Sequence, residues 1–207
     1  MQASRGNSPS RTDPKSRVRV EVLARRDALT PAEIADRSRL AGERLFSTSE
    51  VAAAHIVMFF LAFGSEIHTL PMIERALAEG KRVVAPRPDP KARSLAPAEV
   101  TDPGSHLVPG TYGILEPAPD CPAVEPDSLD VVVVPAAAWA EDGYRIGYGA
   151  GYYDRFLSCT PRAVWVGLGL ELQVVPEVPH DDHDLPVDLL VTDAVVRRFA
   201  YRSGARG

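Results

Sequence analysis

The stretch from Gly143 to Phe156, GYRIGYGAGYYDRF, brings together residue types that can bind an anion. Three glycines alternate in it, Gly147, Gly149 and Gly151, so the backbone can adopt positive φ angles and turn several N–H groups toward one point. Arg145 adds a planar fork of donors that suits a phosphate, and a helix beginning just after the glycines would point its positive end there. The stretch therefore indicates an anion site. A tight loop that needs glycine for its shape and packs its tyrosines is the open alternative.

The glycine spacing excludes two common phosphate loops. G-x-G-x-x-G would need glycine where Tyr152 stands, and a Walker A loop would end in Gly-Lys-Ser/Thr, which is absent. Asp154 falls in the first turn of the expected helix and could coordinate magnesium carried by nucleotide phosphates. The alternative for Asp154 is an acidic residue near a helix start, a contribution of only about 0.3–1 kcal/mol.

The N-terminal segment is locally basic. Asp13 and Pro14 read as an N-cap and first helical residue, which predicts a helix to about Ala28. Lys15 and Arg19 lie one turn apart on it and could grip the same phosphate tail. A solvated face, or a surface for an acidic partner protein, is the alternative.

The elements that must position these residues follow a βαβ pattern. Thr30-Pro31-Ala32-Glu33 is a capping box that predicts a helix to about Leu45. The apolar run HIVMFFLAF (55–63) predicts a buried strand, Thr69 is expected to cap the helix in LPMIERALAEG, and KRVVAP predicts a second strand. Strand, helix and strand in this order imply a parallel sheet.

The remaining chain completes one α/β domain. Residues 86–128 hold ten of the nineteen prolines and are expected to form turns and short extended pieces. Strands are predicted in DVVVVPAAA, AVWVGLGL and DLLVTDAVVRRF, with a helix over about 152–158. The predicted fold is a three-layer α/β/α domain with a mostly parallel central sheet over residues 13–207, and residues 1–12 are expected to form a disordered tail.

Composition excludes several classes of protein. With 45% hydrophobic residues, 25% charged residues and a net charge of −5, the chain is globular and lacks the basic surface that nucleic acids require. The apolar run Ile56–Phe63 is shorter than the roughly 20 residues of a membrane span. The polar N-terminus lacks the apolar segment of a secretory signal, so a cytoplasmic protein is expected. Cys121 and Cys159 have no metal or redox spacing and are expected to be thiols.

Four ordered segments carry a family resemblance. VVVPAAAWAEDGYRIGYGAGYYDRFL resembles the signature of the 5-formyltetrahydrofolate cyclo-ligase (methenyltetrahydrofolate synthetase) family. The pair Lys15 and Arg19, the segment FFLAFGSEIHT, and the segment VGLGLELQVVPEVPHDDHDLPVDLLVTD resemble three further parts of the family pattern. Together they span roughly residues 15–193, which is far more specific than one glycine loop.

The resemblance implies a reaction. ATP and Mg²⁺ would drive closure of 5-formyltetrahydrofolate to 5,10-methenyltetrahydrofolate, with release of ADP and phosphate. Such a phosphoryl transfer requires positioned positive charge and in-line geometry. The folate could carry a polyglutamate tail, and the protein could be a monomer or a homodimer. A folate- or nucleotide-binding regulator that keeps the fold without turnover is the alternative.

The resemblance also implies residue roles. ATP would be bound by Lys15, Arg19, Arg145, Gly147, Tyr148, Gly149, Ala150, Gly151, Tyr152 and Tyr153. The folate would contact Leu61, Glu66, Tyr148 and Tyr152. Arg145 and Tyr153 would be catalytic, and Asp154 and Asp184 would hold magnesium. Without the resemblance, Glu66 and Asp184 would read as solvated acidic residues. Ala150 stands where the family usually has glycine or lysine, which puts the affinity for ATP in question.

Overall fold

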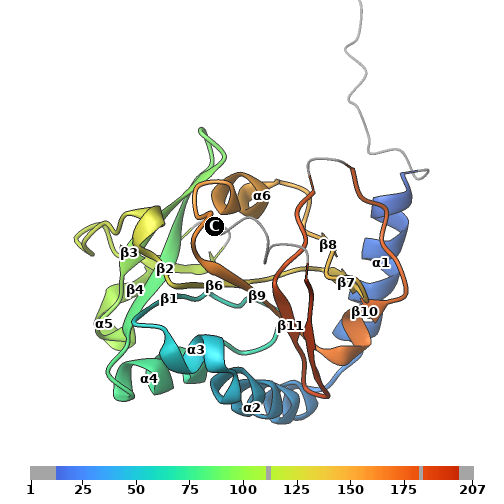
Figure 1. Ribbon diagram of the computed structural model, residues 1–207, viewed down its shortest axis with the longest axis horizontal. Coiled ribbons are helices and arrows are strands. Elements are labelled where there is room, and N and C mark those ends of the chain that lie inside the picture. The colour runs from blue at the N-terminus through green and yellow to red at the C-terminus, as the bar shows by residue number, and fades with distance from the viewer. Residues whose placement is uncertain (1–12, 111–112, 182–183, 201–207) are drawn as a thin grey trace, which may run out of the picture.

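A seven-stranded sheet forms the centre of the computed structural model, which describes residues 13–110, 113–181 and 184–200 (Figure 1). Residues 1–12, for which a tail was predicted, and 201–207 lie outside the described residues. The strand order is β12-β11-β9-β6-β1-β2-β3. Neighbours from β11 to β2 pair in parallel, whereas β12 and β3 add antiparallel edges. The bounds are β1 Ile56–Met58, β2 Arg82–Asp89, β3 Ser94–Glu99, β6 Val131–Val134, β9 Val164–Leu168, β11 Leu189–Val191 and β12 Val196–Arg198.

The parallel strands are apolar without interruption because both of their faces are buried. In β6, Val131 and Val133 pack into one core cluster, and Val132 and Val134 pack into another on the opposite face. A strand with one solvated face would alternate apolar and polar residues instead. The continuous apolar runs of the sequence are thus explained by burial on two sides.

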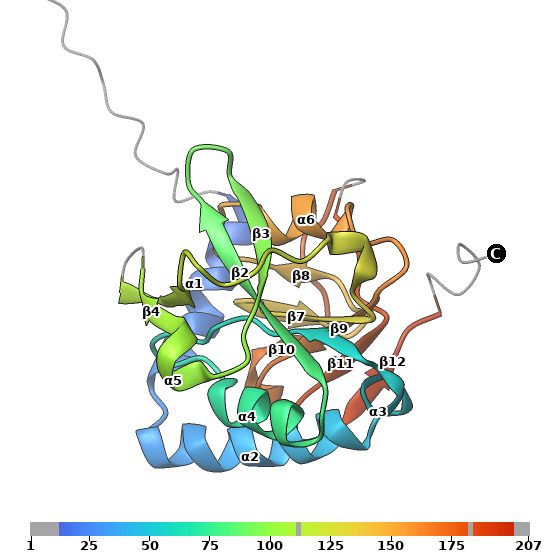
Figure 2. The ribbon, with the colours of Figure 1, turned by 90° about the vertical axis from the view of Figure 1, so that its left-hand side faces the viewer.

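Helices lie on both faces of this sheet, which confirms the predicted three-layer fold (Figures 1 and 2). One layer contains α2 (Pro31–Ser47), α3 (Ser49–Ala53) and α4 (Leu70–Ala78). On the other face lies the short helix α6 (Tyr152–Leu157), near the β2–β3 hairpin. Among the described residues, no helix is long and apolar enough to cross a membrane.

Helix α1 (Pro14–Asp27) lies at the side of the domain, along a small second sheet (Figure 1). This sheet has the order β10-β7-β8. Its strands are β7 Ala138–Ala140, β8 Arg145–Ile146 and β10 Val174–Val175. The smaller elements are α5 Pro103–His106, β4 Leu107–Pro109, β5 Leu115–Pro117 and the 3₁₀ turns Pro126–Ser128 and Glu171–Gln173. The small sheet matters because β8 carries Arg145 and leads into the glycines.

The predicted helix starts are confirmed, and two of the three predicted side-chain caps are present. Asp13 accepts hydrogen bonds from the backbone N–H groups of α1, and Thr30 and Glu33 form the capping box of α2. The predicted side-chain cap at Thr69 is wrong. The Thr69 hydroxyl instead accepts the N–H of Ala62 at 3.2 Å, so it fixes the loop after β1.

Two strand predictions had the wrong length. The run 55–63 gives only Ile56–Met58 as strand, and the chain then leaves the sheet. Strand β2 continues through Pro86 and Pro88 into the proline-rich region and pairs with β3, in a region where turns and short extended pieces were expected. Proline is tolerated there because β1 pairs with β2 only as far as Val84, so beyond that residue one side of β2 is an edge.

Candidate active site

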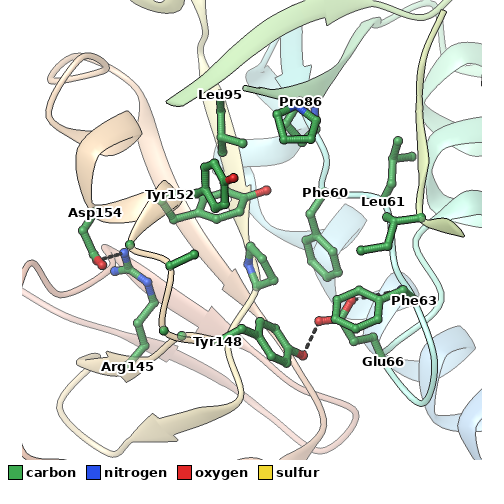
Figure 3. A pocket seen from close by; sticks show the side chains of 18 of the residues that line it. Phe60, Leu61, Phe63, Glu66, Pro86, Leu95, Arg145, Tyr148, Tyr152 and Asp154 are labelled. Carbon is green, nitrogen blue, oxygen red and sulfur yellow. Dashed lines mark hydrogen bonds and ion pairs between the residues drawn. The ribbon is translucent and has the colours of Figure 1, made fainter. Parts of the chain in front are cut away.

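A cavity of about 870 Å³ opens at the carboxyl ends of β1 and β6. Here the sheet order reverses, since the chain proceeds from β1 to β2 on one side and places β6 on the other. Open parallel sheets bind ligands at such a switch point. The segment after β1, the loop and helix after β8, and the β2–β3 hairpin form the walls (Figure 3).

Arg145 occupies the polar end of the cavity. Its side chain is only 4% exposed, and its guanidinium donates to Asp154 Oδ1 at 2.5 Å and to the carbonyl of Leu185 at 2.9 Å. Burial lowers the pKa of Arg145, and the charges of Asp154 and Asp184 oppose that shift. Arginine stays protonated even so. The group is therefore a fixed positive charge in the wall.

Lys15 reaches the same end from α1. Its ammonium donates to Asp184 Oδ2 at 2.6 Å and to Asp181 Oδ2 at 2.8 Å. Burial works against the protonated form, yet the hydrogen bonds to Asp181 and Asp184 raise the pKa of Lys15 above its usual value. Burial likewise works against the ionised form of Asp184, but the bond from Lys15 keeps its pKa below the usual value. The structure thus joins two candidate residues that were assigned to different ligands.

The glycine loop between β8 and α6 adopts the expected conformation at two of its three glycines. Gly149 has φ +101° and Gly151 has φ +66°, while Gly147 has no positive φ. The carbonyl of Gly147 accepts a 2.8 Å hydrogen bond from Arg19 Nε. Arg19 therefore anchors the start of the loop to α1, a role that the sequence did not suggest.

The other end of the cavity is largely apolar and contains the buried carboxylate of Glu66 (Figure 3). Its side chains include Phe60, Leu61, Phe63, Tyr148 and Tyr152. Glu66 is 4% exposed, accepts the hydroxyl of Tyr148, and accepts the backbone N–H of Phe63 at 3.1 Å. Burial raises the pKa of Glu66, and the hydrogen bonds together with the charge of Arg26 oppose that rise.

Arg26 is a site residue that the prediction missed. It is 4% exposed and donates to the Tyr148 hydroxyl at 2.6 Å and to Ser65 Oγ at 2.9 Å. A signal existed in the sequence, because residues 15, 19 and 26 are spaced by four and seven and share one face of a helix. Phe60 and Phe63 were missed as well, because an apolar run was interpreted as one strand.

Tyr153 sits at the first turn of α6 between the two ends. Its hydroxyl is buried and has no hydrogen-bond partner among the described residues. Burial raises the pKa of this phenol well above its ordinary value. Since a buried hydroxyl normally has a partner, the atom is a candidate contact for a ligand.

The carboxylates fit a magnesium ion better than a metal held by protein alone. Within residues 13–110, 113–181 and 184–200 there is no group of three or more His, Cys, Asp or Glu able to hold a metal. Asp154 and Asp184 line the cavity, and the negative charge of each favours the protonated form of Arg145. Two carboxylates suit Mg²⁺, which takes its other ligands from phosphates and water.

Fold and site together define an α/β protein with a ligand cavity at the switch point of a parallel sheet, charged at one end and largely apolar at the other. The model of the 5-formyltetrahydrofolate cyclo-ligase family matches residues 11–193, and the chain belongs to this family. Membership makes the protein a ligase.

Relatives in distant organisms match over nearly their full length. The 5-formyltetrahydrofolate cyclo-ligase of Escherichia coli K12 is 35% identical over 178 residues, covering 84% of this chain and 98% of the relative. The Mus musculus protein of the same name is 26% identical, covering 84% and 91%.

Solved structures agree with the fold. The Aquifex aeolicus 5,10-methenyltetrahydrofolate synthetase superimposes with a TM-score of 0.79 at 32% identity, covering 89% of this chain and 92% of that chain. The Mycoplasma pneumoniae 5,10-methenyltetrahydrofolate synthetase, at 21% identity, shares the fold with a TM-score of 0.70, covering 86% and 98%.

Proposed function

We propose that the protein catalyses the ATP-dependent closure of 5-formyltetrahydrofolate to 5,10-methenyltetrahydrofolate, with release of ADP and phosphate. The supporting observation is that one cavity of about 870 Å³ joins a glycine-lined end, which contains Lys15 and Arg145, to a largely apolar end with a buried carboxylate. A phosphorylated nucleotide suits the first end, and a ring system with N–H donors suits the second. The names of the relatives contain the folate that would occupy the second end.

The apolar end would hold the folate. Leu61, Tyr148 and Tyr152 border the space and would pack against the rings of the substrate. The carboxylate of Glu66 would accept hydrogen bonds from ring N–H groups, because each of its oxygens can accept more than one. This arrangement would fix the orientation of the formyl group toward the polar end.

The polar end would hold the triphosphate. When bound, ATP supplies the phosphoryl group that makes the formyl oxygen a leaving group. Arg145 is held by Asp154 and by the carbonyl of Leu185, so it would meet the transferring phosphoryl group without reorganising. Lys15 would exchange its carboxylate partners for phosphate oxygens, as the phosphate tail enters.

The residues of the glycine loop would line the nucleotide. Gly147 to Gly151 present backbone N–H groups, and Tyr152 and Tyr153 follow at the start of α6. Ala150 stands where the resemblance implies glycine or lysine, and its carbonyl accepts a 2.7 Å hydrogen bond from Arg155. Asp154 and Asp184 would hold Mg²⁺, which neutralises phosphate charge.

The test is a spectroscopic assay. Purified protein is mixed with Mg²⁺, ATP and 5-formyltetrahydrofolate, and the near-ultraviolet absorbance of the methenyl product is followed. We expect product only when ATP is present, with one phosphate released for each product formed. Binding of both ligands without product would contradict the proposal and indicate a regulator on the same fold.

A further inference from the structure

Arg26 connects three separate parts of the chain. It projects from α1, its Nη1 donates to the hydroxyl of Tyr148 in the glycine loop, and its Nε donates to Ser65 in the segment after β1. Tyr148 then donates to Glu66 in that same segment. The buried arginine therefore joins α1, the glycine loop and the folate wall through hydrogen bonds.

The direction of these bonds is fixed by chemistry. Arginine has donors and no acceptor, so the oxygens of Tyr148 and Ser65 must accept from it. Each hydroxyl has a single hydrogen, which it donates in a hydrogen bond to a carboxylate. Tyr148 donates to Glu66, and Ser65 donates to Asp27. The bond from Arg26 to the Tyr148 oxygen thus supports the direction in which the hydroxyl donates to Glu66 Oε1.

The charge of Arg26 acts in the same sense. Glu66 lies in a buried position where the ionised form is disfavoured, and Arg26 lies close enough to oppose that effect. The phenols of Tyr148 and Tyr153 also interact with this carboxylate. Arg26 is the cation among them.

Helix α1 holds the glycine loop at two consecutive residues. Arg19 binds the carbonyl of Gly147, and Arg26 binds the side chain of Tyr148. The two arginines are seven residues apart, about two turns, and project from the same face. Lys15 lies one turn before Arg19 on that face and reaches the polar end of the cavity.

We propose that Arg26 is a positioning residue for the folate end of the cavity. It orients the Tyr148 hydroxyl onto Glu66, and its positive charge favours Glu66 as an acceptor for N–H groups of the substrate. This role rests on the proposed function, since it takes a reduced folate as the ligand of Glu66.

The experiment compares Arg26→Met with Arg25→Met. Arg25 is the matched control, because it is the next residue on the same helix, is half exposed, and pairs with Glu21 at the surface. The affinity for 5-formyltetrahydrofolate and for a non-hydrolysable ATP analogue is measured by calorimetry from pH 5.5 to 8.5, with thermal unfolding alongside. The wild type must bind both ligands and form product in the absorbance assay.

For Arg26→Met we expect folate binding weakened about ten- to hundredfold at neutral pH, the usual scale for hydrogen bonds to charged groups. Folate affinity falls at low pH when Glu66 is protonated, and in Arg26→Met this fall should occur at higher pH, because Glu66 then takes up a proton more readily. Affinity for the ATP analogue should stay near that of the wild type. Arg25→Met should match the wild type in all three measurements.

Tyr148→Phe provides a second test in case Arg26→Met does not fold. Its ring is partly exposed and only the hydroxyl is removed. We expect the same loss of folate affinity and the same shift of its fall at low pH as for Arg26→Met, and no further loss in the double variant.

Two results would overturn the inference. If the wild type binds folate and folded Arg26→Met or Tyr148→Phe has an unchanged affinity and pH profile, then Arg26 only stabilises the fold. If the wild type binds no 5-formyltetrahydrofolate, then the proposed function fails, and this role of Arg26 fails with it.

Discussion

The two ends of the cavity hold their charges in different ways. At the polar end, cations are paired with carboxylates that are partly exposed, such as Asp154, whose side chain is 44% exposed. At the apolar end, Glu66 is almost fully buried and its bonds come from a tyrosine and a backbone N–H. Partly exposed pairs are screened and can exchange partners, whereas a buried carboxylate depends on fixed donors. The first arrangement suits a mobile, highly charged ligand, and the second suits recognition of one ring edge.

The largest effect is expected at the polar end, from Arg145→Ala. Loss of this positioned charge should lower turnover by about 10²- to 10³-fold, the usual scale for one electrostatic contact in a transition state. Folate affinity should change little, because Arg145 lies at the opposite end from Glu66. Steady-state kinetics with a folate-binding titration checks both points, and near-normal turnover would exclude Arg145 from the reaction.

Glu66→Gln tests the opposite end. Glutamine keeps the size of the side chain but accepts less strongly, so folate should bind about ten- to hundredfold more weakly. The affinity for nucleotide should be retained, which would give the reverse of the Arg145→Ala pattern. Calorimetry with each ligand alone measures this, and equal losses for both ligands would show that the two ends do not act separately.

Asp154→Asn tests whether the exposed carboxylate holds metal. We expect turnover reduced roughly tenfold or more, with partial recovery at high Mg²⁺, because asparagine lacks the charge that a hard cation prefers. The same aspartate neutralises buried Arg145, so a change in turnover alone does not identify the role. The magnesium titration does, and an unchanged titration would leave Asp154 as a partner of Arg145 only.

Lys15→Ala should have a smaller effect. The lysine is paired with two carboxylates at the rim, and its loss should raise the ATP concentration needed for half-maximal rate by several-fold, on the scale of one partly exposed charge contact. Deletion of residues 1–12 is the control and should be harmless. The same kinetics for the deletion and for Lys15→Ala would mean that the basic helix only faces solvent.

The smallest expected effects are on the pH dependence of folding stability, to which Glu66 and Asp184 should contribute with opposite signs. Burial raises the pKa of Glu66, so the folded state binds its proton more tightly, and stability falls as pH rises above the unfolded value of 4.5. The pKa of Asp184 is lowered, so its contribution is present above the unfolded value of 3.8 and is lost as pH falls below it. Melting curves of Glu66→Gln and Asp184→Asn against the wild type should therefore diverge at opposite ends of the pH range. Parallel curves would contradict the contrast between the two sites.

Local patterns in the sequence determined the helix starts, the parallel strands and the glycine loop. The capping box at Thr30, the valine run of β6 and the start of α6 each depend on neighbouring residues alone, so they can be read without the rest of the chain. Lys15, Arg145 and Asp154 could be nominated in the same way, because their residue types and spacing already suggest phosphate and metal chemistry.

Tertiary structure decided which distant residues meet. Lys15 and Asp184 are 169 positions apart, and Glu66 and Tyr148 are 82 apart, so no local pattern reports either contact. Arg26 appeared as one of several basic residues, and only the packing of α1 against the glycine loop placed it beneath Tyr148. Burial likewise depends on the whole fold. It raises the pKa of Glu66, whereas at Asp184 burial is outweighed by hydrogen bonds and positive charge, chiefly from Lys15, and the pKa is lowered. The local sequence determines which residue types are present. Their solvation and charge pairing depend on segments that come together only when the chain folds.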